Sequence, residues 1–267
     1  MRKNNTEKIK ILFIGDIVGK PGRRTVKEVL AEIKKDELID LVIANGENLA
    51  AGNGMTYEKY QEMINAGIDY FTSGNHIWNN KDIVEHLDDP KVKVLRPTNY
   101  PDGSPGKGSA EVAPDIFLIN ALGRVFMHDD VEDPFSAILN LTTKHKDKVI
   151  IVDFHAEATS EKVALGHYLN GKVSAVLGTH THVQTADEKI LSEGTGYITD
   201  VGMTGPDDSV LGVKKDIIIE KFLTQLPVSH KVASGDTIFN AVVLTINKKT
   251  KKCTKIKRIS KIIKSQP

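Results

Sequence analysis

Short apolar runs alternate with amphipathic segments along the first two thirds of the chain. The apolar runs are rich in Val, Ile and Leu, as strands buried on both faces of a sheet are. The segments between them repeat apolar residues every three or four positions, which is typical of helices packed on a sheet. Strand followed by helix, repeated, predicts an α/β fold. We expect strands at residues 11–15, 41–45, 69–74, 91–97, 115–123, 149–155 and 174–180, and helices at residues 22–37, 55–67, 79–89, 133–145 and 159–171.

The last third has a different pattern, with several strand-like runs and little helix. The strand-like runs are residues 188–191, 196–200, 231–235 and 239–247, and the helical segment is residues 214–223. Strands that follow one another without intervening helices favour antiparallel pairing, so we expect them to form a second sheet. The predicted fold is a two-sheet α/β sandwich with helices on the outer faces. No break between domains is visible, which predicts a single domain over residues 1–267, with residues 99–115 as a turn-rich loop.

Five of the apolar runs end in side chains of the kind that bind metals. An open α/β sheet gathers the carboxyl ends of its strands along one edge, where such folds place their sites. These side chains should therefore converge, and together they offer enough donors for two metal ions. They follow the runs at residues 11–16, 41–48, 69–76, 149–155 and 175–182, and are Asp16, Glu47, Asn48, Asn75, His76, His155, His180 and His182.

The cysteine content and the lengths of the apolar runs limit the classes of protein to which this chain can belong. Cys253 is the single cysteine, which excludes an intrachain disulfide and a cysteine-based zinc cluster and indicates a reducing compartment. No apolar run approaches the roughly 18 residues of a membrane span, and the polar start at residues 1–10 has no signal-peptide core. We expect a cytoplasmic protein with no membrane partner.

The net charge of +1 hides a basic segment at the end of the chain. Residues 248–264 carry nine Lys and Arg and no acid, which leaves the rest of the chain acidic. A basic segment of this kind can follow the phosphates of RNA. The apolar residues within it, Ile256, Ile259, Ile262 and Ile263, equally suit a final strand or short helix with a solvated lysine face. We favour the second interpretation of residues 248–267.

The sharpest local motif is GTHTH at residues 178–182. Two histidines at positions i and i+2 after a buried strand lie on one side if the extended geometry continues, so both imidazoles can reach one metal cluster. The alternative is a pair of solvated loop histidines. In GNH, residues 74–76, an amide ligand at Asn75 would leave His76 free as a general acid or base. The alternative for His76 is a helix-start histidine packed on Trp78.

The motifs GEN, residues 46–48, and GD, residues 15–16, are weak alone. Glu47 has two oxygens and can bridge a pair of metals, whereas an Asp at position 16 is often only a helix N-cap. The patterns of zinc metalloproteases, serine hydrolases and P-loop proteins are absent, and one cysteine cannot complete a zinc deaminase site. These enzyme classes lose their support.

A pair of divalent ions at this edge favours an anionic phosphate ester as substrate. The two ions supply more positive charge than Asp16, Glu47 and one hydroxide remove, which leaves a net charge of about +1. Two-metal sites also acidify a bridging water and hold it for in-line attack on phosphorus. The ligand set therefore predicts metal-dependent phosphoester hydrolysis.

In this order along the chain, GD, GEN, GNH, a mid-chain His155 and GTHTH resemble the motifs of calcineurin-like metallophosphoesterases. Two positions depart from that pattern: Val18 stands where a histidine is usual, and Glu47 with Asn48 stands where an aspartate is usual. These departures, with the flanking residues of each motif, look like the YmdB-type bacterial subfamily, and the likeness covers residues 9–247.

The resemblance implies a dinuclear phosphodiesterase acting on small cyclic nucleotides by attack of a metal-bridging hydroxide, with 2′,3′-cyclic nucleotides as the first candidates and 3′,5′-cyclic ones as a further candidate. It implies iron, with manganese and zinc as alternatives, and His76 as the acid that protonates the leaving ribose oxygen. One metal would be held by Asp16, Glu47, Asn48 and His182, and the other by the bridging Glu47, Asn75, His155 and His180.

Two rival functions remain at this stage. The chain could be a regulator that binds RNA or a partner protein through residues 248–267, with only slow chemistry at the metals. A dinuclear amidohydrolase is a weaker rival, because that barrel fold usually places its pair of histidines after the first strand and not after a late one. The sequence leaves a homo-oligomer open and does not fix the oligomeric state, and residues that bind the substrate cannot be named from it.

Overall fold

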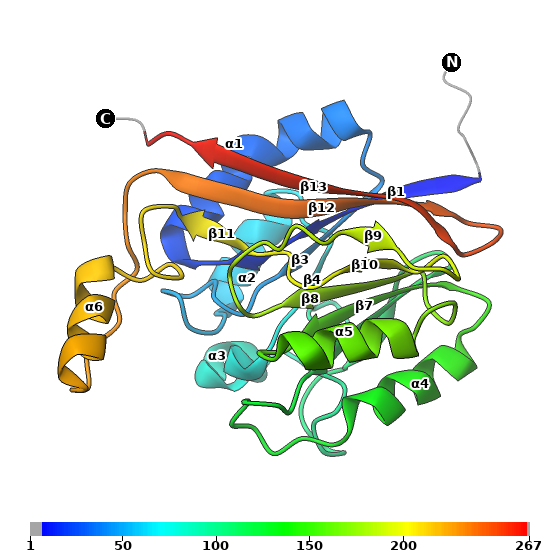
Figure 1. The fold of residues 1–267 in the computed structure, drawn as a ribbon, viewed down its shortest axis with the longest axis horizontal. Helices are drawn as coiled ribbons and strands as arrows, with labels where there is room; N and C mark the ends of the chain where they lie inside the picture. Colours follow the sequence, from blue (N-terminus) through cyan, green and yellow to red (C-terminus); the bar gives the residue numbers. More distant parts are fainter. Residues whose placement is uncertain (1–6, 266–267) are drawn as a thin grey trace.

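The computed structural model describes residues 7–265 and has two mixed β-sheets with helices around them (Figure 1). Residues 1–6 of the polar start and residues 266–267 of the basic segment lie outside the described part. The first sheet has seven strands in the order β2-β11-β12-β1-β3-β4, with β13 paired to β12. Its strands are β1 (Lys8–Ile14), β2 (Asp16–Ile17), β3 (Leu41–Asn45), β4 (Tyr70–Thr72), β11 (Met203–Pro206), β12 (Thr237–Asn247) and β13 (Cys253–Ile263).

The second sheet has six strands in the order β5-β6-β7-β8-β10-β9. Its centre is parallel, because β6, β7 and β8 are each joined to the next by a helix, as in other crossover units. The strands are β5 (Ser109–Ala113), β6 (Ile116–Leu122), β7 (Val149–His155), β8 (Ala175–Thr179), β9 (Lys189–Ile190) and β10 (Gly196–Ile198).

Alternation along β1 shows how the sequence produces the layers. Ile11 and Phe13 point to one face and pack with side chains of the second sheet, such as Leu118 and Ile151. Leu12 points to the opposite face and joins a separate cluster with the outer helices. Burying one side chain of this size contributes about 1.5–3 kcal/mol, so a strand that is apolar on both faces is most stable between a sheet and a helix layer.

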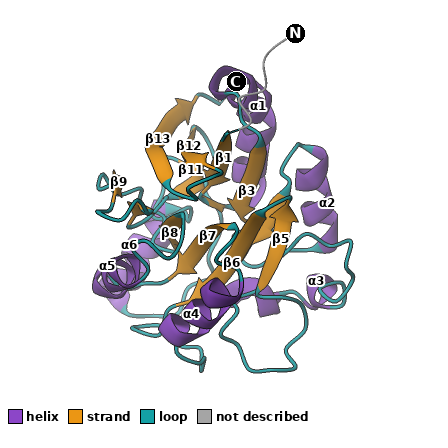
Figure 2. Cartoon of the chain, turned by 90° about the vertical axis from the view of Figure 1, so that its right-hand side faces the viewer, coloured by secondary structure: helices purple, strands orange, loops and turns teal. Residues whose placement is uncertain are grey.

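Helices cover the outer face of each sheet, which confirms the predicted α/β sandwich (Figure 2). The first sheet packs against α1 (Gly19–Glu37) and α2 (Tyr57–Asn65), and the second packs against α4 (Pro134–Lys144) and α5 (Thr159–Tyr168). The remaining helices are the 3-10 helix η1 (Asn75–Asn79), the single turn α3 (Lys81–Val84), and α6 (Lys215–Thr224), which extends away from the sheets in Figure 1.

The prediction that the last third forms the second sheet was wrong. Only β9 and β10 join the second sheet, whereas β11, β12 and β13 return to the first. β12 lies antiparallel to β1, with Leu12 opposite Val243, and is buried on both faces. A strand of this length that is buried on both faces is most stable in the interior of a sheet, and its partner is β1, near the other end of the chain.

Several boundaries also differ from the prediction. Residues 91–97 and 231–235 form only isolated bridges, and the helix predicted at 79–89 is shortened to α3. The loop at 99–115 contains β5, an edge strand whose half-buried side chains give little apolar signal. The basic segment forms β13, which confirms the interpretation of a final strand. No helix among residues 7–265 is long and apolar enough to cross a membrane.

Candidate metal centre

All eight predicted site residues lie at the carboxyl-end edge of the strands, where the two sheets meet. In the first sheet, Asp16 follows β1, Glu47 and Asn48 follow β3, and Asn75 and His76 follow β4. The second sheet supplies His155 as the last residue of β7, and His180 and His182 just after β8. A hydrogen bond from Asn45 Nδ2 to Asp153 Oδ2, 3.0 Å long, ties the end of β3 to β7 directly beneath these side chains.

The centre of the cluster consists of Glu47, His155 and His180. One ligand atom from each lies within 4.8 Å of the other two. His155 Nε2 contacts Glu47 Oε2 and lies 3.0 Å from His180 Nδ1. Carboxylate and imidazole atoms so close together suit a shared cation.

Asn48, His182 and His76 form a second group beside the first. The Asn48 amide lies 3.0 Å from His182 Nε2 and 3.1 Å from His76 Nδ1. His76 Nδ1 is also 3.0 Å from Glu47 Oε1, so the two groups share Glu47. Turning the Asn48 amide over would exchange its oxygen and nitrogen between the two imidazoles.

Three of the predicted ligands have a buried oxygen that accepts no hydrogen bond from the described residues, and His155 Nε2 beside Glu47 Oε2 is an unprotonated nitrogen. Asp16 Oδ1, Glu47 Oε2 and Asn75 Oδ1 are buried and have no hydrogen-bond partner among the described residues. Leaving a buried acceptor unsatisfied costs about 1–3 kcal/mol, and more for a charged group. Buried oxygens of this kind, at the strand ends that also carry the imidazoles, fit the donor set of a metal centre.

Burial shifts the pKa values of the carboxyl groups and of two imidazoles in this region. Burial, assisted by the nearby Asp200 and Glu47 carboxylates, raises the pKa of Asp16 well above its ordinary value. Burial also raises the pKa of Glu47. Burial lowers the pKa of His155 well below its ordinary value and, with the neighbouring His155, that of His180 to about 3. His155 and His180 are therefore neutral, as metal-binding imidazoles must be, and burial opposes the charged form of the Asp16 and Glu47 carboxyl groups.

His155 is oriented by a chain of hydrogen bonds under the cluster. The Thr179 hydroxyl donates to Asp153 Oδ1 over 2.8 Å, so it can accept from His155 Nδ1, which is 2.9 Å away. A proton on Nδ1 leaves the Nε2 lone pair directed at Glu47 and His180. Partners of this type fix the tautomer of metal-binding histidines.

The other two predicted histidine ligands are oriented in the same manner. His182 Nδ1 donates to the Leu211 carbonyl over 2.9 Å, which leaves Nε2 free beside Asn48. His180 Nε2 lies 3.2 Å from Glu157 Oε2, which leaves Nδ1 facing His155. Each histidine therefore has one nitrogen held by the protein and one nitrogen directed into the cluster.

The turn that carries His180 and His182 is not extended, so the condition under which the sequence placed both imidazoles on one side is not met. Both residues have left-handed backbones, with φ of 103° and 65°. A buried ion pair fixes this turn: Asp200 Oδ2 accepts from Lys162 Nζ over 2.7 Å and from the backbone and hydroxyl of Thr181 over 3.0 and 2.8 Å. Both histidines reach the cluster because this turn is held, not because the strand continues.

Gly74 is required at its position for a steric reason. A Cβ atom there would overlap the Glu47 carboxylate and the His155 ring. The glycine of the GNH motif thus lets the backbone pass directly against the two side chains at the centre of the cluster. Any larger residue would displace one of them.

Comparison with known proteins agrees with this geometry. The family model described as YmdB-like protein matches residues 12–259. The chain belongs to this family. A 2′,3′-cyclic-nucleotide 2′-phosphodiesterase of Bacillus subtilis (strain 168) is 48% identical over 256 residues, covering 94% of this chain and 96% of that protein.

Two solved structures of similar length share the fold. A novel phosphatase from Mycoplasma pneumoniae has a TM-score of 0.90 at 35% identity, with 96% of this chain and 94% of that chain covered. A hypothetical protein from Thermus thermophilus has a TM-score of 0.88 at 42% identity, with 95% and 99% covered. The family resemblance predicted from the motifs is confirmed over nearly the whole chain.

Sequence reasoning missed the residues that orient the histidines of the cluster. Asp200 lies two residues after the end of β10, just as Asp16 and Glu47 lie two residues after β1 and β3, so the same strand-end signal could have found it. Thr179 and Asp153 lie inside apolar strands, and Lys162 lies in a helix where a lysine usually faces water. None of these three carries a sequence signal of its own.

Proposed function

We propose that this chain is a metal-dependent phosphodiesterase that hydrolyses 2′,3′-cyclic nucleotides at a centre of two metal ions. The observation that carries the proposal is the cluster of Glu47, His155 and His180, together with the buried oxygens of Asp16, Glu47 and Asn75 that lack a hydrogen-bond partner among the described residues. The substrate class is supported by the activity in the name of the Bacillus subtilis relative. A hydrolase of phosphoric ester bonds agrees with both.

The ligands divide between two ions as the family resemblance implies. One ion would be held by Asp16, Glu47, Asn48 and His182, and the other by Glu47, Asn75, His155 and His180. Two bound ions would neutralise charge on the phosphodiester and acidify a water molecule for attack. Imidazole, carboxylate and amide ligands suit iron, manganese and zinc, of which we propose iron first.

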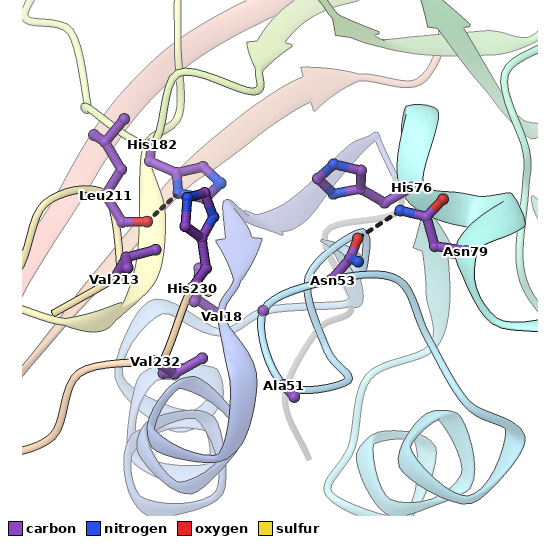
Figure 3. Close-up of a pocket in the computed structure, with 12 residues that line it drawn as sticks. Val18, Ala51, Asn53, His76, Asn79, His182, Leu211, Val213, His230 and Val232 are labelled. Atoms are coloured by element: carbon purple, nitrogen blue, oxygen red, sulfur yellow. Dashed lines mark hydrogen bonds between the residues drawn. The ribbon is translucent and has the colours of Figure 1, made fainter. Parts of the chain in front are cut away.

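His76 is the residue proposed to supply the proton. Its Nδ1 faces Glu47 Oε1 and the Asn48 amide, so Nε2 is the nitrogen left for the substrate. The side chain is 34% exposed and lines a cavity beside the cluster (Figure 3). In the reaction, a water oxygen bonds to phosphorus and gives up a proton to the solvent, the bond from phosphorus to ribose O2′ breaks, and O2′ takes a proton from His76. The products are a nucleoside 3′-phosphate and a neutral His76, which takes a proton back from the solvent.

Metal analysis of the purified protein, combined with a panel of phosphodiesters, tests this function. We expect about two ions per chain and turnover of 2′,3′-cyclic nucleotides that a chelator abolishes and added metal restores. Activity on 3′,5′-cyclic nucleotides is a secondary expectation of the same panel. Full turnover in the presence of chelator, or no turnover of any diester with both metals bound, would contradict the proposal.

The alternative role as an RNA- or protein-binding regulator has less support. Most of the basic segment forms β13, which pairs with β12. Three of its basic side chains already form ion pairs within the protein, which are Lys257–Glu37, Arg258–Glu188 and Lys261–Glu32. RNA contact through this segment, a homo-oligomer and a cytoplasmic location stay predictions.

A further inference from the structure

A cavity of about 500 Å³ lies beside the metal ligands, and its chemistry differs from theirs (Figure 3). This volume is within the range of roughly 300–1,000 Å³ that is typical of small-molecule sites. His76 and His182 form the wall that it shares with the cluster. The rest of the lining contains no Lys, Arg, Asp or Glu. The cavity is therefore unsuited to an anion and suited to the uncharged part of a ligand.

One side of the cavity is apolar. Val18, Leu211, Val213 and Val232 come from three separate segments and offer a surface for the face of a flat ring. Two of them are held by glycines, since Val18 packs where a Cβ of Gly212 would lie, and Val232 packs where Cβ atoms of Gly19 and Gly52 would lie. This wall is therefore built by specific packing between distant segments.

The other side carries a pair of amides. Asn79 Nδ2 donates to Asn53 Oδ1 over 2.6 Å, and the two side chains lie across the cavity from the apolar wall (Figure 3). This bond leaves the Asn53 amide nitrogen as a donor and the Asn79 oxygen as an acceptor. An adjacent donor and acceptor match the edge of a nucleobase or the hydroxyls of a ribose.

His230 completes the polar lining beside His182 (Figure 3). It lies after α6 in an exposed segment that is fixed to the body two residues later. The Ala233 N–H donates to the Gly212 carbonyl over 2.9 Å, and Val232 is bridged to Val213. The imidazole is thus held at the cavity and can donate a hydrogen bond to a sugar or base oxygen.

We propose that this cavity binds the nucleoside part of the substrate, with His230 and the Asn53–Asn79 pair as specificity-determining contacts. The inference rests on the proposed phosphodiesterase function, because it places the phosphate at the metal ligands and the base against the valine wall. His76, between the two, then faces the ribose oxygen that leaves.

The test compares two cyclic diesters that have the same five-membered phosphate ring. Cyclic 2′,3′-AMP carries a nucleoside and ethylene phosphate does not. For His230→Ala and Asn79→Ala, we expect the ratio of kcat/KM between the two diesters to fall by about 3- to 10-fold, mainly through a higher KM, as loss of one hydrogen bond predicts. The matched controls are His167→Ala on α5 and Asn140→Ala on α4, which should keep the wild-type ratio. Like His230 and Asn79, both control residues are exposed.

Calorimetric titration with adenosine 3′-phosphate separates failure of the subsite from failure of the function. We expect wild-type protein to bind this nucleotide more tightly than either cavity variant. If it does so but hydrolyses neither diester, the phosphodiesterase proposal fails and the subsite stands. If both diesters are hydrolysed and the two cavity variants keep the wild-type ratio and affinity, the subsite is wrong and the function stands.

Discussion

At the scale of single residues, Glu47 is the side chain on which both groups of ligands depend. It is 1% exposed, with Oε2 against His155 and Oε1 against His76. Glu47→Gln keeps the shape but removes the negative charge that the two proposed cations would share. We expect metal affinity to fall by roughly 100-fold or more, since even residues behind metal ligands contribute about 10- to 100-fold.

Elemental analysis and turnover of Glu47→Gln check this expectation, with the exposed Glu132→Gln as control. A Glu47→Gln protein with two tightly held ions and full activity would show that Glu47 does not join the two metals.

His76 is predicted to act on the leaving group and not on the metals. His76→Ala should keep its metal content and hydrolyse 2′,3′-cyclic nucleotides about 10² to 10⁴ times more slowly, which is the usual contribution of a general acid. The loss should be much smaller on bis(p-nitrophenyl) phosphate, because a nitrophenolate leaves without a proton.

Parallel kinetics on the two substrates, with metal analysis of the same preparation, decide the role of His76. Equal losses on both would rule out proton donation, and loss of metal would make His76 a ligand instead.

Residues with reactive side chains at strand ends could be predicted from the sequence, while the residues that orient them could not. Asp16, His155 and His180 each follow an apolar run, and that position alone indicates the sheet edge. Thr179 and Asp153 meet through the pairing of β7 with β8, which is a contact between distant segments. The pattern along one strand contains no information about such a contact.

At the scale of elements, the turn after β8 depends on its connection to α5. Lys162 and Asp200 are each 1% exposed and form a buried ion pair beneath that turn. Lys162→Met leaves the Asp200 carboxylate buried without its cation, which typically costs about 3–5 kcal/mol. We expect a lower free energy of unfolding and weaker metal binding, because His180 and His182 lose their fixed turn.

Denaturant unfolding and metal titration measure both effects, and the exposed Lys144→Met on α4 serves as control. A Lys162→Met protein as stable as wild type with unchanged metal affinity would show that the pair does not position the turn.

The attachment of β13 to α1 should depend on pH. The hydrogen bond from Lys257 is the main reason why the pKa of Glu37 is lowered. An acid with a lowered pKa in the folded state stabilises the protein above its unfolded pKa of about 4.3, and loses this contribution as pH falls through the folded value. Lys257→Met should therefore cost less than about 1 kcal/mol near pH 7, since the pair is partly exposed.

The difference between wild type and Lys257→Met should vanish in acid, when Glu37 is protonated in both proteins. Urea unfolding at a series of pH values measures it. A difference that stays constant down to low pH would assign the effect to packing of the lysine stem and not to the ion pair.

At the scale of the whole molecule, the cluster joins the two sheets. Glu47 and Asn75 come from the first sheet, while His155 and His180 come from the second. The sandwich could be predicted because apolar residues on both faces of a strand show, within that strand alone, that both faces are buried. The sequence could not show which strands belong to which sheet, since β12 pairs with β1 across almost the full length of the chain. Such pairing is decided by the packing of the complete core.

A site that spans both sheets links metal binding to the stability of the entire molecule. If residues 1–267 form one domain, as the sequence predicts, thermal unfolding should be a single transition, because the two sheets share one apolar core. A metal that binds only the folded state adds about 2.7 kcal/mol at 100 times its Kd. We therefore expect added manganese to raise the Tm of metal-stripped protein and a chelator to reverse this, whereas Asp16→Asn with His155→Ala should not respond. Two separate transitions would contradict the single domain, and an unchanged Tm in the wild type would contradict a metal centre between the sheets.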